Sequence, residues 1–252
     1  MGEVRATDLA KPFFVLYVVW HPSFELGEKI ADAMMQHFRR DLYKNIVGGA
    51  GIPVVFRNAC MPDNDIPISI NPEDSEASAI IALVDDNLCE SQSWVDYVKG
   101  LSEKTEDSNK NGFNNLLFPV SFNKEALHKV NLNEQALRWD SWKGDDNEKT
   151  MRLISELTYE FCRMLRHHLA QLENPSNKNL ENYLKKVQIF LSHSKHDSDG
   201  TEIATSIRKR IHEGHGLSSF FDVNDIPAGL RFDEVLLAQV RISAMIAIHT
   251  DS

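Results

Sequence analysis

The feature that most constrains the fold is residues 13–20, an uninterrupted apolar run rich in β-branched and aromatic side chains. The run is far shorter than the roughly 20 apolar residues that a bilayer-spanning helix needs. A short continuous apolar run predicts a strand that is buried on both faces, as strands are in a parallel sheet. Residues 25–43 follow with apolar side chains at helical spacing, so we expect a helix there that packs on the sheet.

The alternation of strand and helix patterns continues to about residue 172. Further strands are predicted at residues 52–56, 79–84 and 116–120, and further helices at residues 91–103 and 147–172. Pro53 places the second strand at a sheet edge or marks its start, because proline cannot donate a ladder hydrogen bond. Polar residues at 58–78 and 105–112 predict loops. This alternation implies a parallel sheet with helices on both faces.

The predicted helix at residues 147–172 carries one apolar stripe that we expect to face the sheet. Its members are Leu153 or Ile154, Leu157, Phe161, Leu165, Leu169 and Leu172. A polar linker with Pro175 follows at residues 174–185, where the apolar period is lost. We therefore expect a first α/β domain at residues 1–173.

The same α/β pattern then restarts at residues 186–252. Strands are predicted at residues 187–191, 217–221 and 244–248, helices at 202–212 and 232–242, and a loop at 222–229. The second domain thus holds three strands and is predicted to be incomplete. A three-stranded piece buries little core and leaves an open edge, so we expect it to be ordered only when packed on the first domain or on another copy.

Composition excludes several classes of function. The chain has 27 basic and 37 acidic residues and a net charge of −10, the reverse of the balance that a nucleic-acid binder needs. Residues 1–11 are polar and lack the apolar core of a secretory signal. Three widely spaced cysteines suit reduced thiols better than a disulfide framework. We expect a cytoplasmic protein with no nucleic-acid or membrane partner.

Two loops of the second domain carry the most specific pattern. Residues 190–197 (FLSHSKHD) follow its first strand, and residues 220–229 (FFDVNDIPAG) follow its second. In a doubly wound sheet the ligand crevice lies beyond the carboxyl ends of the strands, where both loops emerge. The hydroxyl and imidazole groups of Ser192, His193 and Ser194 can meet ribose or phosphate oxygens.

Phe190 and Phe221 can give a base a stacking surface, and Gly229 permits a loop reversal. The alternative interpretation is purely structural. In it Ser192 and Asp222 cap turns and the two phenylalanines belong to the core.

The ordered pair of loops, with a helix between and after them, resembles the Toll/interleukin-1 receptor (TIR) domain, and most closely its bacterial members. The resemblance covers residues 186–252, about the first half of such a domain. It implies a flavodoxin-like, three-layer fold for both parallel-sheet units. It also implies self-association through TIR domains, or binding to partner TIR proteins.

Some TIR domains are scaffolds, whereas others hydrolyse NAD at the nicotinamide–ribose bond. The resemblance implies that Phe190, Ser192 and Ser194 line the nicotinamide side of a pocket, with His193 beside them. Asp222 and the loop from Asp225 to Gly229 then gate it. NAD is the implied substrate, and no cofactor is expected.

In the enzymes of the family a glutamate stabilises the positive charge that develops on the ribose, as in glycoside hydrolysis. It lies in a Ser-x-x-Trp-Cys-x-x-Glu-like stretch that follows the third strand. The strand predicted at residues 244–248 is followed only by four residues that end at Ser252. The resemblance therefore places the expected glutamate beyond Ser252. The chain itself is predicted to have no catalytic residue and to be inactive.

The first domain resembles a divergent TIR-like domain that precedes TIR domains in bacterial defence-type proteins. Ser93-Trp94 lies where the family has its Ser/Trp/Cys/Glu helix, but the glutamate position is Val98. Asp96 points elsewhere, because two residues turn a helix by about 200°. Asp65-Ile66-Pro67 only echoes the second-domain loop. We expect the first domain to be non-catalytic.

Other candidate sites are weak. The adjacent His167 and His168 face different directions and cannot form a metal pair four residues apart. Asp85 and Asp86 are expected to cap the end of a strand rather than bind a metal. The three cysteines have no His or Asp in a catalytic order, and no glycine-rich phosphate loop is present.

Two functions remain from the sequence. The first is a bacterial immune-type, anti-phage TIR protein whose full-length form hydrolyses NAD on self-association. The second is a non-enzymatic TIR scaffold that signals by homotypic domain binding. The activating signal and the product, plain or cyclised ADP-ribose, stay open.

Overall fold

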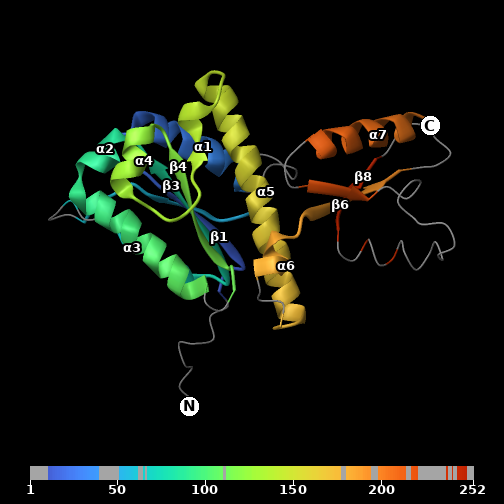
Figure 1. Cartoon of the computed structure of the whole chain (residues 1–252), viewed down its shortest axis with the longest axis horizontal. Coiled ribbons are helices and arrows are strands. Elements are labelled where there is room, and N and C mark those ends of the chain that lie inside the picture. The colour runs from blue at the N-terminus through green and yellow to red at the C-terminus, as the bar shows by residue number, and fades with distance from the viewer. Residues whose placement is uncertain are drawn as a thin grey trace, which may run out of the picture. The chain divides into compact units, whose positions relative to one another are not determined.

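The computed structural model describes residues 11–39, 51–61, 65, 67–109, 112–176, 180–193, 198–213, 217–220, 237, 240 and 243–248. The chain divides into two compact units, residues 1–179 and 180–252 (Figure 1). Each unit is described by itself.

Unit 1 contains a five-stranded, all-parallel sheet in the order β2-β1-β3-β4-β5. Its strands are β1 (Phe14–Val19), β2 (Val54–Arg57), β3 (Ala77–Val84), β4 (Asn115–Ser121) and β5 (Leu137–Arg138). This is a flavodoxin-like order. The strand after Pro53 lies at the sheet edge, as predicted, and the Leu16 N–H donates to the Pro53 carbonyl at 2.9 Å.

Helices cover both faces of this sheet (Figure 1). They are α1 (Glu25–Phe38), α2 (Asp86–Glu90), α3 (Gln92–Asn109), α4 (Lys124–Val130) and α5 (Asp146–Glu173), with short 3-10 turns η1 (Pro72–Asp74) and η2 (Trp139–Ser141). Helices α1 and α5 contact each other, whereas α2, α3 and α4 form the opposite layer. The predicted α/β class with parallel sheets is confirmed.

The core explains why β1 has no polar position. All six of its residues are buried. Val15 and Tyr17 belong to the apolar cluster that includes Trp94 of α3. The alternate residue Phe14 packs edge-on against Phe161 of α5, with ring centroids 5.6 Å apart. Successive side chains of a strand point to opposite faces, so helices on both sides bury every position.

The short elements of unit 1 were not predicted. Helices α2 and α4 and strand β5 fall outside the predicted set, and α3 extends through most of the loop expected at residues 105–112. The polar composition of the last residues of α3 predicted a loop there, although the helix continues to Asn109. There the Thr105 and Ser108 hydroxyls donate to carbonyls three residues earlier, at 2.9 and 3.0 Å. This satisfies the hydroxyls within the helix, so the polar residues do not end it.

The predicted apolar stripe of α5 is partly wrong. Leu153, Ile154, Leu157 and Phe161 are buried, but Leu169 and Leu172 are 51% and 60% exposed. Met164, His167, His168 and Gln171 are buried instead. Successive steps of four residues drift by about 40° each, which carries Leu169 away from the face of Phe161. Leu172 lies in the last turn of the helix.

Unit 2 has a smaller, three-stranded parallel sheet in the order β7-β6-β8. Its elements are α6 (Leu180–Leu184), β6 (Val187–Ser192), α7 (Ser198–Glu213), β7 (Leu217–Phe220) and β8 (Ala244–Ala247). Helix α6 lies within residues expected to be linker. Leu191, Ala204 and Ile211 form the buried core, whereas all four residues of β8 are exposed. Of the helix predicted at residues 232–242, the described residues include only Leu237 and Val240, both helical.

Candidate functional site

The carboxyl edge of the unit 1 sheet is a candidate binding site. From β1 the chain passes to α1 on one face, and from β3 it passes to α2 on the other. Ligands of open α/β sheets bind where the connections diverge in this way. His21 follows β1 and Asp85 follows β3 at this edge.

A polar cluster lies on the connections that leave this edge. The Asp65 carboxylate accepts hydrogen bonds from the Ser91 hydroxyl at 2.8 Å, the Ser93 hydroxyl at 3.2 Å and the Cys60 thiol at 3.3 Å. A bridge between Cys60 and Pro67 closes the loop that carries Asp65. The hydrogen bonds from Ser91 and Cys60 hold the pKa of Asp65 below its usual range. This exposed carboxylate is therefore a hydrogen-bond acceptor at neutral pH, not a proton donor.

The cysteines have thiol pKa values that disfavour nucleophilic chemistry. Burial, followed by the hydrogen bond to Asp65, raises the pKa of Cys60. Burial raises the pKa of Cys89 to about 11, and its thiol donates to the Ala126 carbonyl at 3.2 Å. Cys162 is a free thiol on the exposed surface of α5. Because the thiolate is the reactive form, Cys60 and Cys89 are poor nucleophiles.

Helix α3 is apolar at the position where the expected TIR resemblance would place a glutamate. Trp94 and Val98 of α3 are both fully buried in the core cluster. The His21 ring packs against Trp94, with centroids 5.3 Å apart. Asp96 is exposed and accepts a hydrogen bond from the Gln92 amide at 2.7 Å. Val98 therefore offers no charge to a substrate at this edge.

Asp85 and Asp86 have structural partners. Asp85 caps α2, because its carboxylate accepts from the Leu88 and Asn87 backbone N–H groups at 3.1 and 3.2 Å. Asp85 therefore caps the helix that follows β3, whereas the sequence predicted a cap of the strand end. Asp86 accepts from the Asn123 side-chain amide at 2.5 Å. Within the described ranges, no group of three or more His, Cys, Asp or Glu side chains is placed to hold a metal ion.

The predicted unit 2 site is described only in part. Phe190 is buried in β6, which fits its alternative role as a core residue, and its backbone is in register with residue 220 of β7. Ser192 ends β6 and is half-buried, and its carbonyl accepts from the Ile248 N–H at 2.8 Å. His193 follows directly and is also half-buried.

The other predicted site residues lie outside the described residues. They are Ser194, Asp222, Asp225 and Gly229, together with the stacking candidate Phe221. The structure therefore brings together Phe190, Ser192 and His193 at the carboxyl end of the central strand of this sheet, and it leaves the gating loop untested.

The expected catalytic glutamate of unit 2 is not tested either. The sequence interpretation placed it beyond Ser252, and Ser252 itself lies outside the described residues, the last of which is Ile248. The described part of unit 2 ends directly after β8, and the helix that was expected to carry the glutamate lies outside it. The absence of a catalytic carboxylate from this unit therefore stays a prediction from the sequence.

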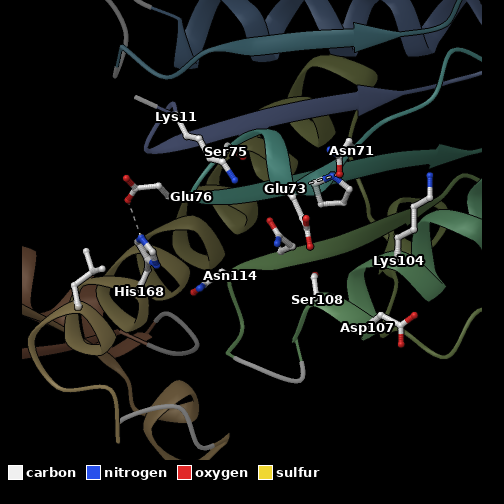
Figure 2. A pocket seen from close by; sticks show the side chains of 13 residues that line it. Lys11, Asn71, Glu73, Ser75, Glu76, Lys104, Asp107, Ser108, Asn114 and His168 are labelled. Atoms are coloured by element: carbon white, nitrogen blue, oxygen red, sulfur yellow. Dashed lines mark hydrogen bonds and ion pairs between the residues drawn. The ribbon is translucent and has the colours of Figure 1, made fainter. Parts of the chain in front are cut away.

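A pocket of about 750 Å³ lies at the opposite, amino edge of the unit 1 sheet (Figure 2). It is far from the carboxyl-edge chemistry, so the two are separate candidate sites. Its walls come from the segments before β1, β3 and β4 and from the last turns of α3 and α5. In it the Nε2 of the buried His168 lies 3.3 Å from the Glu76 carboxylate. Sequence reasoning missed this pocket, because its residues form no contiguous motif.

No protein-family model matches the chain, and a search of curated proteins finds no similar sequence. Among the helices of the described residues, none combines the length and apolar composition needed to span a membrane.

Proposed function

We propose that this chain comes from a TIR-domain protein of bacterial immune-type, anti-phage signalling. In this proposal the full-length protein hydrolyses NAD at the nicotinamide–ribose bond when it self-associates. Unit 2 contributes the front of the NAD pocket, and the catalytic glutamate follows Ser252 in the full-length protein. Unit 1 is a non-catalytic regulatory or docking domain.

One observation carries the proposal: both units start with the same parallel arrangement. The first strand of each, β1 or β6, lies between the second and the third, and a helix, α1 or α7, connects the first strand to the second. In unit 2 this puts Ser192 and His193 at the carboxyl end of the central strand. A nucleotide bound at such an edge meets these polar side chains first. The buried Val98 supports a non-catalytic role for unit 1, because the resemblance places the catalytic glutamate there.

The proposal is tested by incubating the full-length protein with NAD and measuring nicotinamide release by liquid chromatography. Release is expected when the protein is forced to assemble through a fused oligomerising tag. The 252-residue chain is expected to release none. Ser192→Ala should lower the rate, with Ser176→Ala, in the turn after α5, as the matched control. No release under forced assembly would refute the enzymatic proposal.

Exposed apolar residues in unit 2 favour the second candidate, a non-enzymatic scaffold. Leu237 and Met245 are 60% and 61% exposed, and Val240 and Ile246 are also exposed. Such side chains are typical of surfaces that bind another protein. The scaffold predicts concentration-dependent association in light scattering without nicotinamide release, and Met245→Asp should weaken that association.

A further inference from the structure

The outer edge of β2 carries backbone groups that have no backbone partner in the described part of the chain. Strand β2 is the edge strand of the unit 1 sheet, and it pairs with β1 on its inner side. The Pro53 and Arg57 carbonyls accept hydrogen bonds from the β1 side at 2.9 and 3.4 Å. Because alternate residues of a parallel strand bond to the same neighbour, Val54 and Phe56 turn their N–H and carbonyl groups outward.

The side chain of Arg57 covers one of these outward groups. Its Nη1 donates to the Phe56 carbonyl at 3.0 Å. Its guanidinium lies over the Tyr17 ring, with Cζ 5.8 Å from the centroid. A strand that adds to this edge would use the Phe56 carbonyl as an acceptor, and the guanidinium already occupies it. Charged side chains at strand edges protect them from pairing in this way.

The hold of Arg57 on the edge is incomplete. A guanidinium has five N–H donors, but within the described residues only Nη1 of Arg57 makes a hydrogen bond. The Nε is buried and has no partner among them. A buried donor without a partner costs free energy, so the covered edge is not strongly favoured over an open one.

The backbone of this edge is complementary to a second copy of itself. An antiparallel pair with a two-fold axis at Val55 sets Val54 opposite Phe56 of the second copy. Each outward N–H then donates to a carbonyl of the other copy. Half of these hydrogen bonds end on a Phe56 carbonyl, which is the atom that Arg57 covers. Pairing therefore requires Arg57 to move.

The side chains suit the same pairing. Val54 and Phe56 lie on one face of the strand, where the Phe56 ring packs against Trp20 with centroids 5.2 Å apart. Across the antiparallel pair a valine of one copy meets a phenylalanine of the other, which is a favourable combination of β-branched and aromatic side chains. Residues 53–56 carry no charge, so no like charges meet there despite the net charge of −10.

We propose that the outer edge of β2 is an interface for a second copy of this chain and that Arg57 keeps it closed. In the closed form the guanidinium holds the Phe56 carbonyl, and in the open form the two β2 strands pair antiparallel. The interface lies in unit 1 and involves no nucleotide, so it is independent of the proposed NAD chemistry.

The first test measures self-association of the 252-residue chain by sedimentation velocity over a range of concentrations. Arg57→Met keeps an unbranched side chain over Tyr17 but removes the donors. It should tighten self-association about tenfold, the usual effect of one hydrogen bond to a charged group. Lys124→Met, on the exposed start of α4, is the matched control for charge and should behave like the unchanged chain.

A second substitution locates the association at β2. Val54→Pro removes an outward N–H and leaves the ladder to β1 intact, because an edge strand tolerates proline where the N–H faces outward. It should abolish the association that Arg57→Met adds. Met245→Asp should leave that association intact, which separates it from any contact through unit 2.

The third test is crosslinking with Arg57 in place, so it is decisive even if Arg57→Met does not fold. In the proposed pair the two Val55 residues are directly opposite, with Cα atoms about 4.5 Å apart, which suits a disulfide. Val55→Cys oxidised with diamide should therefore give linked copies well above the level of the unchanged chain. Equal association of Arg57→Met and Lys124→Met, association insensitive to Val54→Pro, or no added crosslinking by Val55→Cys would overturn the proposal.

Discussion

The substitution Val98→Glu tests whether position 98, where the proposed resemblance expects a glutamate, can hold a charge in unit 1. Val98 is fully buried beside Trp94 and Leu101, on the helix α3. An ionised carboxylate in that cluster is desolvated and has no cationic neighbour in the apolar cluster. The folded protein therefore holds the new carboxyl protonated, and its pKa rises well above the usual ~4.3.

The magnitude follows from the pKa difference. A folded-state pKa above 7 and an unfolded-state pKa of ~4.3 cost about 3–4 kcal/mol at pH 7, at about 1.4 kcal/mol per unit. Because folding raises the pKa of this carboxyl, the loss of stability is absent below pH ~4.3 and grows as pH rises toward the folded-state pKa. Val98→Gln is the neutral control of similar size. It shares the loss of apolar burial, about 1.5–3 kcal/mol for a valine, but not the charge.

The assay is urea unfolding followed by tryptophan fluorescence between pH 4 and 8. All four tryptophans lie between residues 20 and 142, so the signal reports unit 1 alone. The stability gap between the two variants should widen by about 1.4 kcal/mol per pH unit above ~4.3. A gap below about 1 kcal/mol that does not change with pH would contradict this account, because position 98 would then reach solvent or a positive charge.

Three further outcomes are expected. Asp85→Ala should lower the stability of unit 1 by about 1 kcal/mol in the same urea assay, because α2 loses its cap, whereas the exposed Asp96→Ala should change it little. The Asp65 carboxyl should titrate below its usual pKa by NMR, and Ser91→Ala should move the pKa upward; an unchanged value would argue against the hydrogen-bond assignment. Cys89 in the folded chain should react with iodoacetamide much more slowly than in urea at pH 8, since its pKa is about 11. Equal rates would contradict the raised pKa of this half-buried thiol.

Much of the scaffold could be predicted from local pattern. The strands β1, β3 and β4 are continuous apolar runs, and only a sheet covered on both faces buries every position of such a run. Pro53 predicted either an edge strand or a strand start, and both hold, because β2 is an edge strand that starts directly after Pro53. Short elements were missed because a helix of five or seven residues, such as α2 or α4, contains too few turns to show a period.

The candidate sites were less predictable. The sequence around Asp65 only resembled part of the second-domain loop. Its hydrogen bonds with Ser91 and Ser93 join residues 26 and 28 positions apart. The amino-edge pocket joins Ser75 to His168, which lie 93 positions apart along the chain. No local repeat in the sequence predicts that two residues so far apart line the same pocket.

Apolar periodicity was enough to establish the class of fold and its repetition, because it is a local property that fixes which faces must be buried. The residue pattern also predicted that position 98, where the proposed TIR resemblance expects a carboxylate, holds a valine. Which polar groups are satisfied, in contrast, emerged from the packing of distant segments. Asp85 caps a helix and the Asn115 side chain accepts a hydrogen bond from Ser78, whereas the buried Ser75 Oγ, Asn114 Oδ1 and His168 Nδ1 have no hydrogen-bond partner among the described residues. Hydrogen bonding of a side chain depends on what other segments bring within about 3 Å, and that is set by tertiary packing.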